Sequence, residues 1–394
     1  SIDSAKIGGI LANNASGMCC GIEQNSYQTL DSMRLVLADG TAVDTAEDTS
    51  RAEFARTHGA ILDKLAKLRQ RVLGDEQLAE RIRYKFKIKN TTGYSLNALV
   101  DFDEPYDIMI HLMIGSEGTL GFISDVVYRT VVEHRHKASA LIFYPDVKTA
   151  CQAIPHLRKL PVAAAELIDR AGLRSVEGKP GMPEYLTELG STVTALLVET
   201  RAESADILTA QIGQICEAIK ELPTVRPVTF TDVPVEYTAL WKIRKGLFPA
   251  VGAVRKTGTT VIIEDVAFPS EHLADAALDL QALLKKYGYD EAIIFGHALD
   301  GNLHFVFTQD FSSRLEVDRY RDFMAEVVTL VVEKYDGSLK AEHGTGRNMA
   351  PFVQKEWGDA AFNLMREIKA IFDPLNLLNP GVILNDDAMA HIKD

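Results

Sequence analysis

Two apolar runs on either side of a short polar turn constrain the fold of this chain more than any other stretch. Residues 293–295 are apolar, residues 303–307 are apolar except for His304, and Asp-Gly-Asn stands between the two runs at positions 300–302. Asp-Gly is a typical turn sequence, so the stretch predicts two neighbouring strands joined as a β-hairpin. The hairpin would bring His297 and His304 near each other, with side chains about 5 Å apart if the two residues are direct partners.

Two imidazoles at the end of a hairpin could bind a divalent metal, provided that a carboxylate completes the ligand set. Glu342, in the sequence Ala-Glu-His-Gly further along the chain, is a candidate for that carboxylate. The alternative is that His297 and His304 are ordinary strand-end residues whose nitrogens are satisfied by hydrogen bonds. The hairpin sequence alone leaves both interpretations open.

The composition excludes several classes of protein. The chain has 394 residues, enough for two or three domains, and 46% of them are apolar and 25% charged. A net charge of -13 argues against nucleic acid as a main partner. Four cysteines without a CxxC motif indicate neither a disulfide framework nor an iron–sulfur site, which favours a reducing, cytoplasmic setting. No apolar run approaches the ~18 residues of a membrane-spanning helix.

Two stretches, residues 7–17 and 115–121, are rich in glycine and small polar residues. Such residues allow positive φ angles and let backbone N–H groups approach a ligand closely. Residues 7–17 could instead form a tight surface turn, and residues 115–121 lack the spacing of a GxGxxG motif or a P-loop. Residues 89–94, with the sequence KNTTGY, form a third polar loop.

Periodic patterns predict the regular elements between these loops. The expected strands are 33–37, 140–143, 163–168, 192–198, 260–266 and 292–295, and the expected helices are 51–72, 147–158, 204–219, 271–287 and 317–331. Residues 108–114 are apolar and are expected to form a strand or a short buried segment. Pro180-Gly181 and residues 223–234 mark loops. From about residue 133, two split βαβ units closed by the hairpin predict an antiparallel ferredoxin-like sheet with helices on one face.

The motifs GGILANNASG (8–17), KNTTGY (89–94) and GSEGTLGFIS (115–124), in that order, resemble the second half of the flavin-binding domain of the vanillyl-alcohol oxidase / FAD-linked oxidase superfamily. Later motifs are similar to its D-lactate and D-2-hydroxyglutarate dehydrogenase branch, including GHALDGNLH (296–304), EHG (342–344) and FDPLNLLNPG (372–381). The resemblance implies FAD as cofactor. It implies contacts with FAD from Gly8, Gly9, Asn14, Ser16, Gly17, Gly115, Glu117, Gly118, Gly121, Ile123 and Asn379.

The resemblance also implies a fold class and a domain organisation. The fold is expected to be α+β, with a partial PCMH-type FAD-binding domain and a ferredoxin-like antiparallel sheet as the cap, or substrate, domain. Residues 1–132 would be the second half of the FAD-binding domain, and residues 133–394 the cap domain. The first pyrophosphate loop of the superfamily, of the type Pro-Arg-Gly-Gly-Gly-Thr, has no match here. The first half of the FAD-binding domain is therefore expected to be missing, either from a shortened relative or from a fragment.

The same resemblance assigns chemical roles. His297, His304 and Glu342 would be the ligands of a divalent metal, zinc or manganese. His343 would be the base that accepts the hydroxyl proton, although it could simply cap the turn at residues 344–346. Arg244 would bind the substrate carboxylate, although without the family it is equally an exposed helix charge. Asn302 would hydrogen-bond the substrate or position a ligand.

These roles predict FAD-dependent oxidation of a D-lactate-like 2-hydroxy acid to the 2-oxo acid. Phe248 and Ile263 stand where the 2-hydroxyglutarate enzymes carry a threonine and a lysine for the distal carboxylate, and Arg255 or Lys256 could substitute. D-2-hydroxyglutarate dehydrogenase, glycolate oxidase and a relative of alkyl-glycerone-phosphate synthase are the alternatives within the class. A non-catalytic module that binds a metal or another ligand is the alternative outside it.

The expected partners are a small 2-hydroxy acid and an electron acceptor, which could be a protein, a quinone or an iron–sulfur domain. Neither nucleic acid nor a transmembrane segment is expected, and a homodimer is the assembly to test. The expected location is the cytoplasm, either free or at the periphery of the inner membrane.

Overall fold

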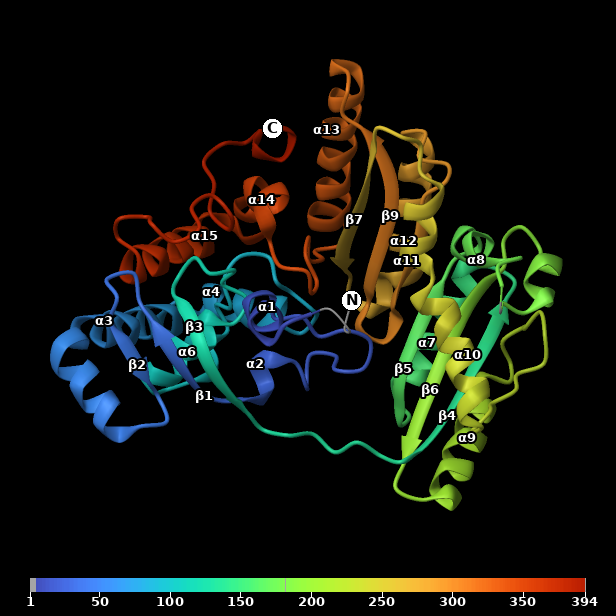
Figure 1. Cartoon of the computed structure of the whole chain (residues 1–394), viewed down its shortest axis with the longest axis horizontal. Coiled ribbons are helices and arrows are strands. Elements are labelled where there is room, and N and C mark those ends of the chain that lie inside the picture. Colours follow the sequence, from blue (N-terminus) through green and yellow to red (C-terminus); the bar gives the residue numbers. More distant parts are fainter. Residues whose placement is uncertain (1–4, 181, 394) are drawn as a thin grey trace. The chain divides into compact units, whose positions relative to one another are not determined.

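The computed structural model describes residues 5–180 and 182–393, so Gly181 of the expected Pro180-Gly181 loop lies outside the described residues. The chain divides into two compact units. The first unit comprises Ser1–Val131 together with Gly337–Asp394, and the second comprises Val132–Asp336. Figure 1 shows the chain coloured along its sequence. Among the described residues, no helix combines the length and the apolar character needed to cross a bilayer.

The first unit contains a three-stranded antiparallel sheet in the order β2-β1-β3, which Figure 1 shows with helices beside it. Its strands are β1 (Leu30–Val36), β2 (Ala42–Asp44) and β3 (Phe122–Tyr128). Its helices are α1 (Ile7–Asn13), α2 (Ser26–Thr29), α3 (Asp48–Gly74), α4 (Glu76–Lys85), α5 (Ala98–Asp101), α6 (Pro105–Met113), α14 (Gly346–Met349) and α15 (Val353–Phe372), with short turns η5 (Ala350–Phe352) and η6 (Ala390–Ile392). The hairpin turn between β1 and β2 has Gly40 at φ 87°.

The apolar run 108–114 forms most of helix α6, and its last residue is the C-cap of that helix. The expectation of a short buried segment is confirmed, and the alternative expectation of a strand was wrong. Pro105 begins the helix, where its missing N–H costs no hydrogen bond. Residues from Ile108 to Met113 are all buried, because α6 lies inside the apolar core of this unit. A helix that is apolar on every side has no 3.6-residue pattern, so its sequence resembles that of a buried strand.

The C-terminal stretch packs within the first unit. Leu364, Met365 and Ile368 of α15 belong to the same buried apolar cluster as α3 and α6. Arg71 of α3 also forms an ion pair with Glu367, at 2.7 Å. The expected boundary of 133–394 for the second domain therefore differs from the compact units, since residues 337–394 join the first unit.

The second unit is built on a six-stranded antiparallel sheet in the order β4-β6-β5-β8-β9-β7, and its antiparallel pairing confirms the expected fold class. The strands are β4 (His136–Tyr144), β5 (Val162–Ile168), β6 (Thr194–Ala202), β7 (Thr259–Ala267), β8 (Ile293–His297) and β9 (Asn302–Asp310). The helices are α7 (Val147–Leu157), α8 (Arg170–Val176), α9 (Ala205–Ile219), α10 (Pro234–Lys245), α11 (Leu247–Val254), α12 (Leu273–Lys286) and α13 (Arg314–Val328). Shorter helical segments are the 3₁₀-helices η1 (Glu184–Glu188), η2 (Ser270–His272) and η3 (Ala298–Asp300), and the π-helix η4 (Thr329–Lys334).

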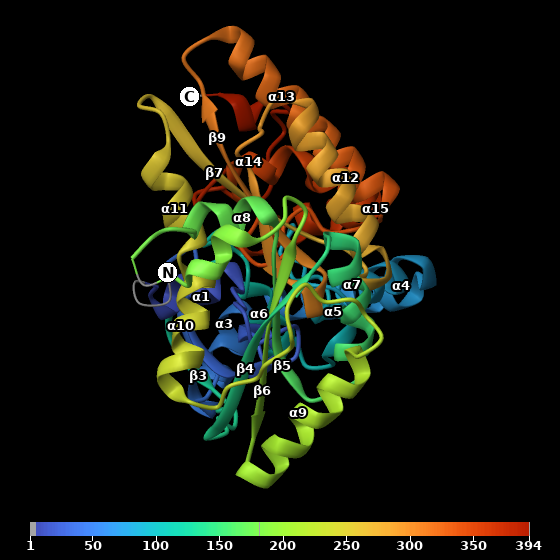
Figure 2. The same cartoon turned by 90° about the vertical axis from the view of Figure 1, so that its right-hand side faces the viewer.

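Helices cover both faces of this sheet, so the expectation of helices on one face was wrong. Figure 2 shows α10 and α9 on opposite sides of the strands β4 and β6. Phe143, Ile168 and Phe295 form one apolar cluster with α8, α10 and α11. Ile294, whose side chain alternates with that of Phe295, faces α12 instead. The strands in the middle of the sheet are buried on both faces, so their sequences show little alternation between apolar and polar residues. The sequence therefore did not indicate the second layer of helices.

The predicted hairpin is present as β8, the short turn η3 and β9. Its register pairs Phe295 with His304, so His297 and His304 are diagonal neighbours and not direct partners. Gly301 ends the turn at φ 67°. A side chain there would lie 2.0 Å from the carbonyl oxygen of Phe268, which explains why glycine is required. The close approach fixes the end of β7 against the turn, and with it the positions of both histidines.

Candidate functional site

His297 and His304 meet on the face of the second sheet that α10 covers. Their Nε2 atoms are 3.3 Å apart, and both side chains are buried. Zn–N bonds of about 2.0–2.1 Å in tetrahedral geometry place two nitrogen ligands ~3.3–3.4 Å apart. The observed spacing therefore matches two ligands of one metal ion. It is also long for a hydrogen bond between two imidazoles.

A carboxylate lies behind each histidine. Nδ1 of His297 is 2.7 Å from Oε1 of Glu166, its direct partner across strands β5 and β8. Nδ1 of His304 is 3.3 Å from Oδ1 of Asp265, its direct partner across β7 and β9. An ionised carboxylate only accepts, so His297 would donate from Nδ1, and a neutral imidazole would then carry a lone pair on Nε2. A carboxylate behind the imidazole is the usual support of a metal-binding histidine.

Arg244 lies beside this pair and is buried, which excludes the interpretation as an exposed helix charge. Its Nε atom donates to Oε2 of Glu166 at 2.8 Å, and its guanidinium carbon lies 4.3 Å above the ring of Phe295. Within the described part of the chain, its terminal amino groups have no hydrogen-bond partner. A guanidinium held in this way offers two parallel donors, the geometry that a carboxylate accepts best.

Asn302 is buried at the start of β9, where its amide group donates to Oδ1 of Asp265 at 2.7 Å and to the carbonyl oxygen of Val266 at 3.0 Å. Among the described residues its Oδ1 atom has no hydrogen-bond partner. The side chain therefore positions Asp265 and also presents a buried acceptor. The contact that the structure shows for Asn302 is with Asp265, the carboxylate beside His304.

Glu166 and Asp265 are candidate functional residues that the sequence analysis missed. Each is fully buried in the middle of a strand, in the sequences Val-Ala-Ala-Ala-Glu-Leu-Ile and Thr-Thr-Val-Ile-Ile-Glu-Asp-Val-Ala. A carboxylate inside an apolar strand must have a partner, because burying an unpaired charge costs several kcal/mol. That rule could have marked both residues as candidates, although not their partners.

Glu342 lies in the first unit, where three donors meet one of its oxygens. Oε2 accepts from Ser16 Oγ at 2.8 Å, from the Gly17 N–H at 2.8 Å and from Lys89 Nζ at 3.0 Å. Lys89 also donates to the carbonyl oxygen of Gly17. The loop at residues 14–17 and the KNTTGY loop are therefore joined at Glu342, so two of the expected FAD-contacting residues are near an expected metal ligand within this unit.

His343 follows in a chain segment whose backbone is firmly held. Its carbonyl oxygen accepts from the Asn13 side chain at 2.7 Å. The next residue, Gly344, has φ 81° and donates its N–H to Thr91 Oγ1 at 3.0 Å. Oε2 of Glu117 accepts the N–H of Gly346 at 3.0 Å. The His343 side chain is half-buried.

The stretch 7–17 begins as a helix and not as the loop expected throughout. Gly8 and Gly9 lie exposed in α1, and the left-handed conformation begins only at Asn14, with φ 53°, and recurs at Gly17. A short helix of this composition escapes pattern analysis, because glycine disfavours helices in general. The loop expected to contact FAD is thus limited to residues 14–17 within this stretch.

The second glycine-rich stretch is a loop, as expected. Gly115, Glu117 and Gly118 all have positive φ angles. Burial raises the pKa of the Glu117 carboxyl to about 7, against the lowering effect of the hydrogen bond from Gly346. Asn379 donates to the Glu117 carbonyl oxygen at 2.8 Å and so links the C-terminal turn to this loop.

The end of the same stretch runs into the first sheet. Gly121 packs closely against Met113, because a Cβ atom at position 121 would lie 3.3 Å from the Met113 sulfur. Ile123 lies in strand β3. These two residues therefore serve the packing of the first unit in addition to any contact with a cofactor.

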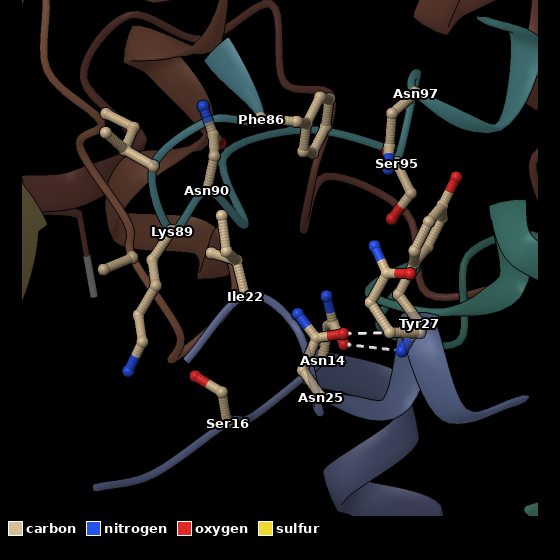
Figure 3. Close-up of a pocket in the computed structure, with 13 residues that line it drawn as sticks. Asn14, Ser16, Ile22, Asn25, Tyr27, Phe86, Lys89, Asn90, Ser95 and Asn97 are labelled. Carbon is tan, nitrogen blue, oxygen red and sulfur yellow. Dashed lines mark hydrogen bonds between the residues drawn. The ribbon is translucent and has the colours of Figure 1, made fainter. Parts of the chain in front are cut away.

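A small pocket with a cavity volume of about 30 Å³, lined mostly by polar side chains, lies in the first unit beside Asn14 and Ser16. Figure 3 shows the amide groups of Asn25, Asn90 and Asn97 around it. The Oδ1 atom of Asn97 is buried and has no hydrogen-bond partner among the described residues. A buried acceptor of this kind fits a ligand with hydroxyl or N–H groups, and FAD carries both. The polar groups of this small pocket thus suit contact with one polar part of FAD, and the pocket does not enclose the whole cofactor.

Each unit gathers some of the expected residues. Within the second unit, His297 and Arg244 both contact Glu166, His297 lies beside His304, and Asn302 and His304 both contact Asp265. Within the first unit, Glu342 joins the 14–17 loop, while Glu117 joins the residues after His343 and the turn at Asn379.

Comparisons with known proteins identify the family of this chain. Residues 133–383 match the family described as FAD linked oxidases, C-terminal domain, and residues 1–46 match the family described as FAD binding domain. The chain is 29% identical over 293 residues to glycolate oxidase subunit GlcD of Bacillus subtilis, covering 73% of this chain and 59% of that protein. It is 28% identical to the mitochondrial D-lactate dehydrogenase [cytochrome] of Arabidopsis thaliana, covering 96% and 56%.

It is also 26% identical to D-2-hydroxyglutarate dehydrogenase of Pantoea ananatis, covering 96% of this chain and 38% of that protein. The chain therefore spans little more than half, or less, of the length of these relatives. Among solved structures, p-cresol methylhydroxylase with substrate bound is similar in fold, with a TM-score of 0.60, 14% identity, and coverage of 98% of this chain and 71% of that chain. The expected resemblance and fold class are confirmed.

Proposed function

This chain belongs to the FAD-linked oxidase family, and from that premise we propose that it oxidises a D-2-hydroxy acid to the corresponding 2-oxo acid. The side chain of the substrate is small and apolar, like that of D-lactate. One observation carries the proposal. His297 and His304 present their Nε2 atoms 3.3 Å apart, backed by Glu166 and Asp265, beside a buried arginine.

FAD, when bound, supplies the acceptor for the hydride, and a divalent cation held by His297 and His304 supplies positive charge that favours loss of the hydroxyl proton. The proposed cation is Zn²⁺ or Mn²⁺. Glu342 is the proposed third ligand on the strength of the EHG motif. Its carboxylate is also bound by Ser16, Gly17 and Lys89.

The side chains of the protein have three tasks in this proposal. Arg244 holds the substrate carboxylate with its two terminal amino groups, which fixes the face of the substrate that meets the flavin. His343 accepts the hydroxyl proton. Glu166 keeps the imidazole of His297 in the orientation and tautomer that leave Nε2 able to bind a cation, and Asp265 places a negative charge beside Nδ1 of His304.

The apolar surroundings support a substrate without a second carboxylate. Ile263 packs against the apolar cluster on the same face of the sheet as His304, and Phe248 lies half-exposed on α11 one turn beyond Arg244. Arg255 and Lys256 are exposed and lie in the loop before β7. A distal carboxylate would need one of them, so D-2-hydroxyglutarate is the second candidate and glycolate the third. The relatives named above motivate both alternatives.

The electron acceptor and the assembly are proposed on the same family resemblance. The reduced flavin would pass its electrons to a protein, a quinone or an iron–sulfur domain, and the assembly would be a homodimer. A non-catalytic binding module is the competing function, and it predicts metal binding without any turnover.

The test is a substrate panel with an artificial electron acceptor, run on the protein supplied with FAD and Zn²⁺. We expect a flavin absorbance spectrum, turnover of D-lactate above D-2-hydroxyglutarate and glycolate, and little turnover of L-lactate. His343→Ala should lower kcat by ~10²–10⁴-fold with an unchanged melting temperature, because it removes a proton acceptor. Absence of both a flavin spectrum and any preference for the D-enantiomer would refute the proposed function.

A further inference from the structure

One buried carboxylate connects the two binding groups of the second unit. Oε1 of Glu166 lies 2.7 Å from Nδ1 of His297, and Oε2 lies 2.8 Å from Nε of Arg244. The Glu166 side chain has no exposed surface. The two oxygens share one negative charge. A stronger hydrogen-bond donor at one oxygen therefore draws negative charge toward it and leaves less on the other oxygen.

We propose that Glu166 is a positioning residue that couples metal binding at His297 to carboxylate binding at Arg244. This inference rests on the proposed function, in which these two residues bind the metal and the substrate. It extends that function, because it makes the affinity for each ligand depend on the other.

The direction of the coupling follows from the charges. A cation at Nε2 of His297 makes its Nδ1–H a stronger donor, which draws the charge of Glu166 toward Oε1. Arg244 is then less neutralised and binds an added carboxylate more tightly. By reciprocity, a carboxylate at Arg244 releases charge to His297 and raises its affinity for the metal by the same factor.

The surrounding structure holds Glu166 and its two partners in place. It lies in the middle of strand β5, paired with Leu197 on one side and His297 on the other. The ring of Phe295 lies under the Arg244 guanidinium, so that group is held in place as well. Small shifts of charge between fixed partners can therefore act without any movement of the backbone.

The neighbouring strand β6 offers a matched control. Glu199 is a buried carboxylate on the same face, where it accepts from Trp241 Nε1 at 2.6 Å and from Arg201 Nε at 2.7 Å. Its described hydrogen bonds include none to either histidine of the site. Glu199→Gln therefore removes a buried charge from this face without removing the partner of a metal-binding imidazole.

The experiment is calorimetric titration of the full chain with Zn²⁺, in the absence and presence of propionate. Propionate is the three-carbon acid without the 2-hydroxyl group, so it offers a carboxylate to Arg244 and cannot be oxidised at that position. In the wild type, we expect saturating propionate to lower the Kd for Zn²⁺ by at least ~5-fold. Arg244→Met should abolish this effect, which establishes where propionate acts.

In Glu166→Gln, the Kd for Zn²⁺ alone should rise by ~10–100-fold, because the imidazole loses its anionic partner. The effect of propionate should fall to within about twofold, whereas Glu199→Gln should leave the Kd for Zn²⁺ alone unchanged. Glu166→Asp, which keeps the charge but cannot reach both partners, is the second variant if the glutamine variant does not fold.

Three results would overturn the inference while leaving the proposed function standing. They are an equal propionate effect in wild type and Glu166→Gln, an unchanged Kd for Zn²⁺ in that variant, or a propionate effect that survives in Arg244→Met. A wild-type protein that binds no Zn²⁺ overturns the proposed metal site and the inference together.

Discussion

The Nζ atom of Lys85 lies 3.0 Å from Oε1 of Glu356, and neither side chain has any surface exposed to solvent. Asn90 Nδ2 donates to the same oxygen at 2.9 Å, and the Leu339 N–H donates to Oε2 at 2.8 Å. Lys85 also donates to the carbonyl oxygen of Gly337. This network joins α4, the KNTTGY loop, the segment before Glu342 and α15 within the first unit.

Lys85→Met should therefore lower the free energy of unfolding by about 3–5 kcal/mol, because it leaves the Glu356 carboxylate buried without its cation. Urea denaturation measures this loss. The matched control is Arg71→Met, which breaks the exposed ion pair with Glu367 that also joins a helix to α15. We expect that variant to lose no more than ~1 kcal/mol. Equal losses in the two variants would contradict the importance of the buried network.

Gly301→Ala should disturb the turn that positions both histidines. The new methyl group would collide with the Phe268 carbonyl oxygen, and alanine also disfavours φ 67°. We expect a loss of at least ~2 kcal/mol in unfolding free energy and weaker Zn²⁺ binding. Gly213→Ala, in the open surface of α9, is the control. It should leave Zn²⁺ binding unchanged and raise the stability by ~0.5–1 kcal/mol.

The raised pKa of Glu117 should make the protein less stable to unfolding as the pH rises. Its pKa is raised from 4.5 to about 7 by burial, so the folded protein binds more protons than the unfolded chain between these values. The free energy of unfolding therefore decreases through pH 4.5–7 on account of this group. Melting temperatures of the wild type and Glu117→Gln, measured from pH 5 to 8, should converge at low pH. Above pH 7 the variant should be the more stable, and parallel curves would contradict the assignment.

Trp241 anchors the helix that carries Arg244. Its Nε1 atom donates to Glu199 at 2.6 Å, and Ser139 and Arg201 complete the partners of that carboxylate. Trp241→Phe removes a hydrogen bond to a charged group, which should cost about 1.5–3 kcal/mol. Because Arg244 lies one turn further along α10, we expect the KM for D-lactate to rise several-fold with a smaller change in kcat. An unchanged KM would show that α10 keeps its position without this bond.

The sequence by itself determined the local elements and the family. The Asp-Gly-Asn turn between apolar runs predicted the hairpin that holds His297 and His304, because turn chemistry and strand patterning act over a few residues. The motifs in their order identified the superfamily, and Arg244 followed from them. Most strands and helices of the second unit were likewise predicted from their periodicity.

The tertiary structure alone decided which residues stand beside those histidines. Glu166 reaches His297 because β5 and β8 are neighbours in the sheet, and it reaches Arg244 because α10 crosses the same face. Strand order depends on contacts between distant segments, which no local pattern records. The helical state of α6 has the same cause, since burial on all sides removes the pattern that would distinguish a helix from a strand.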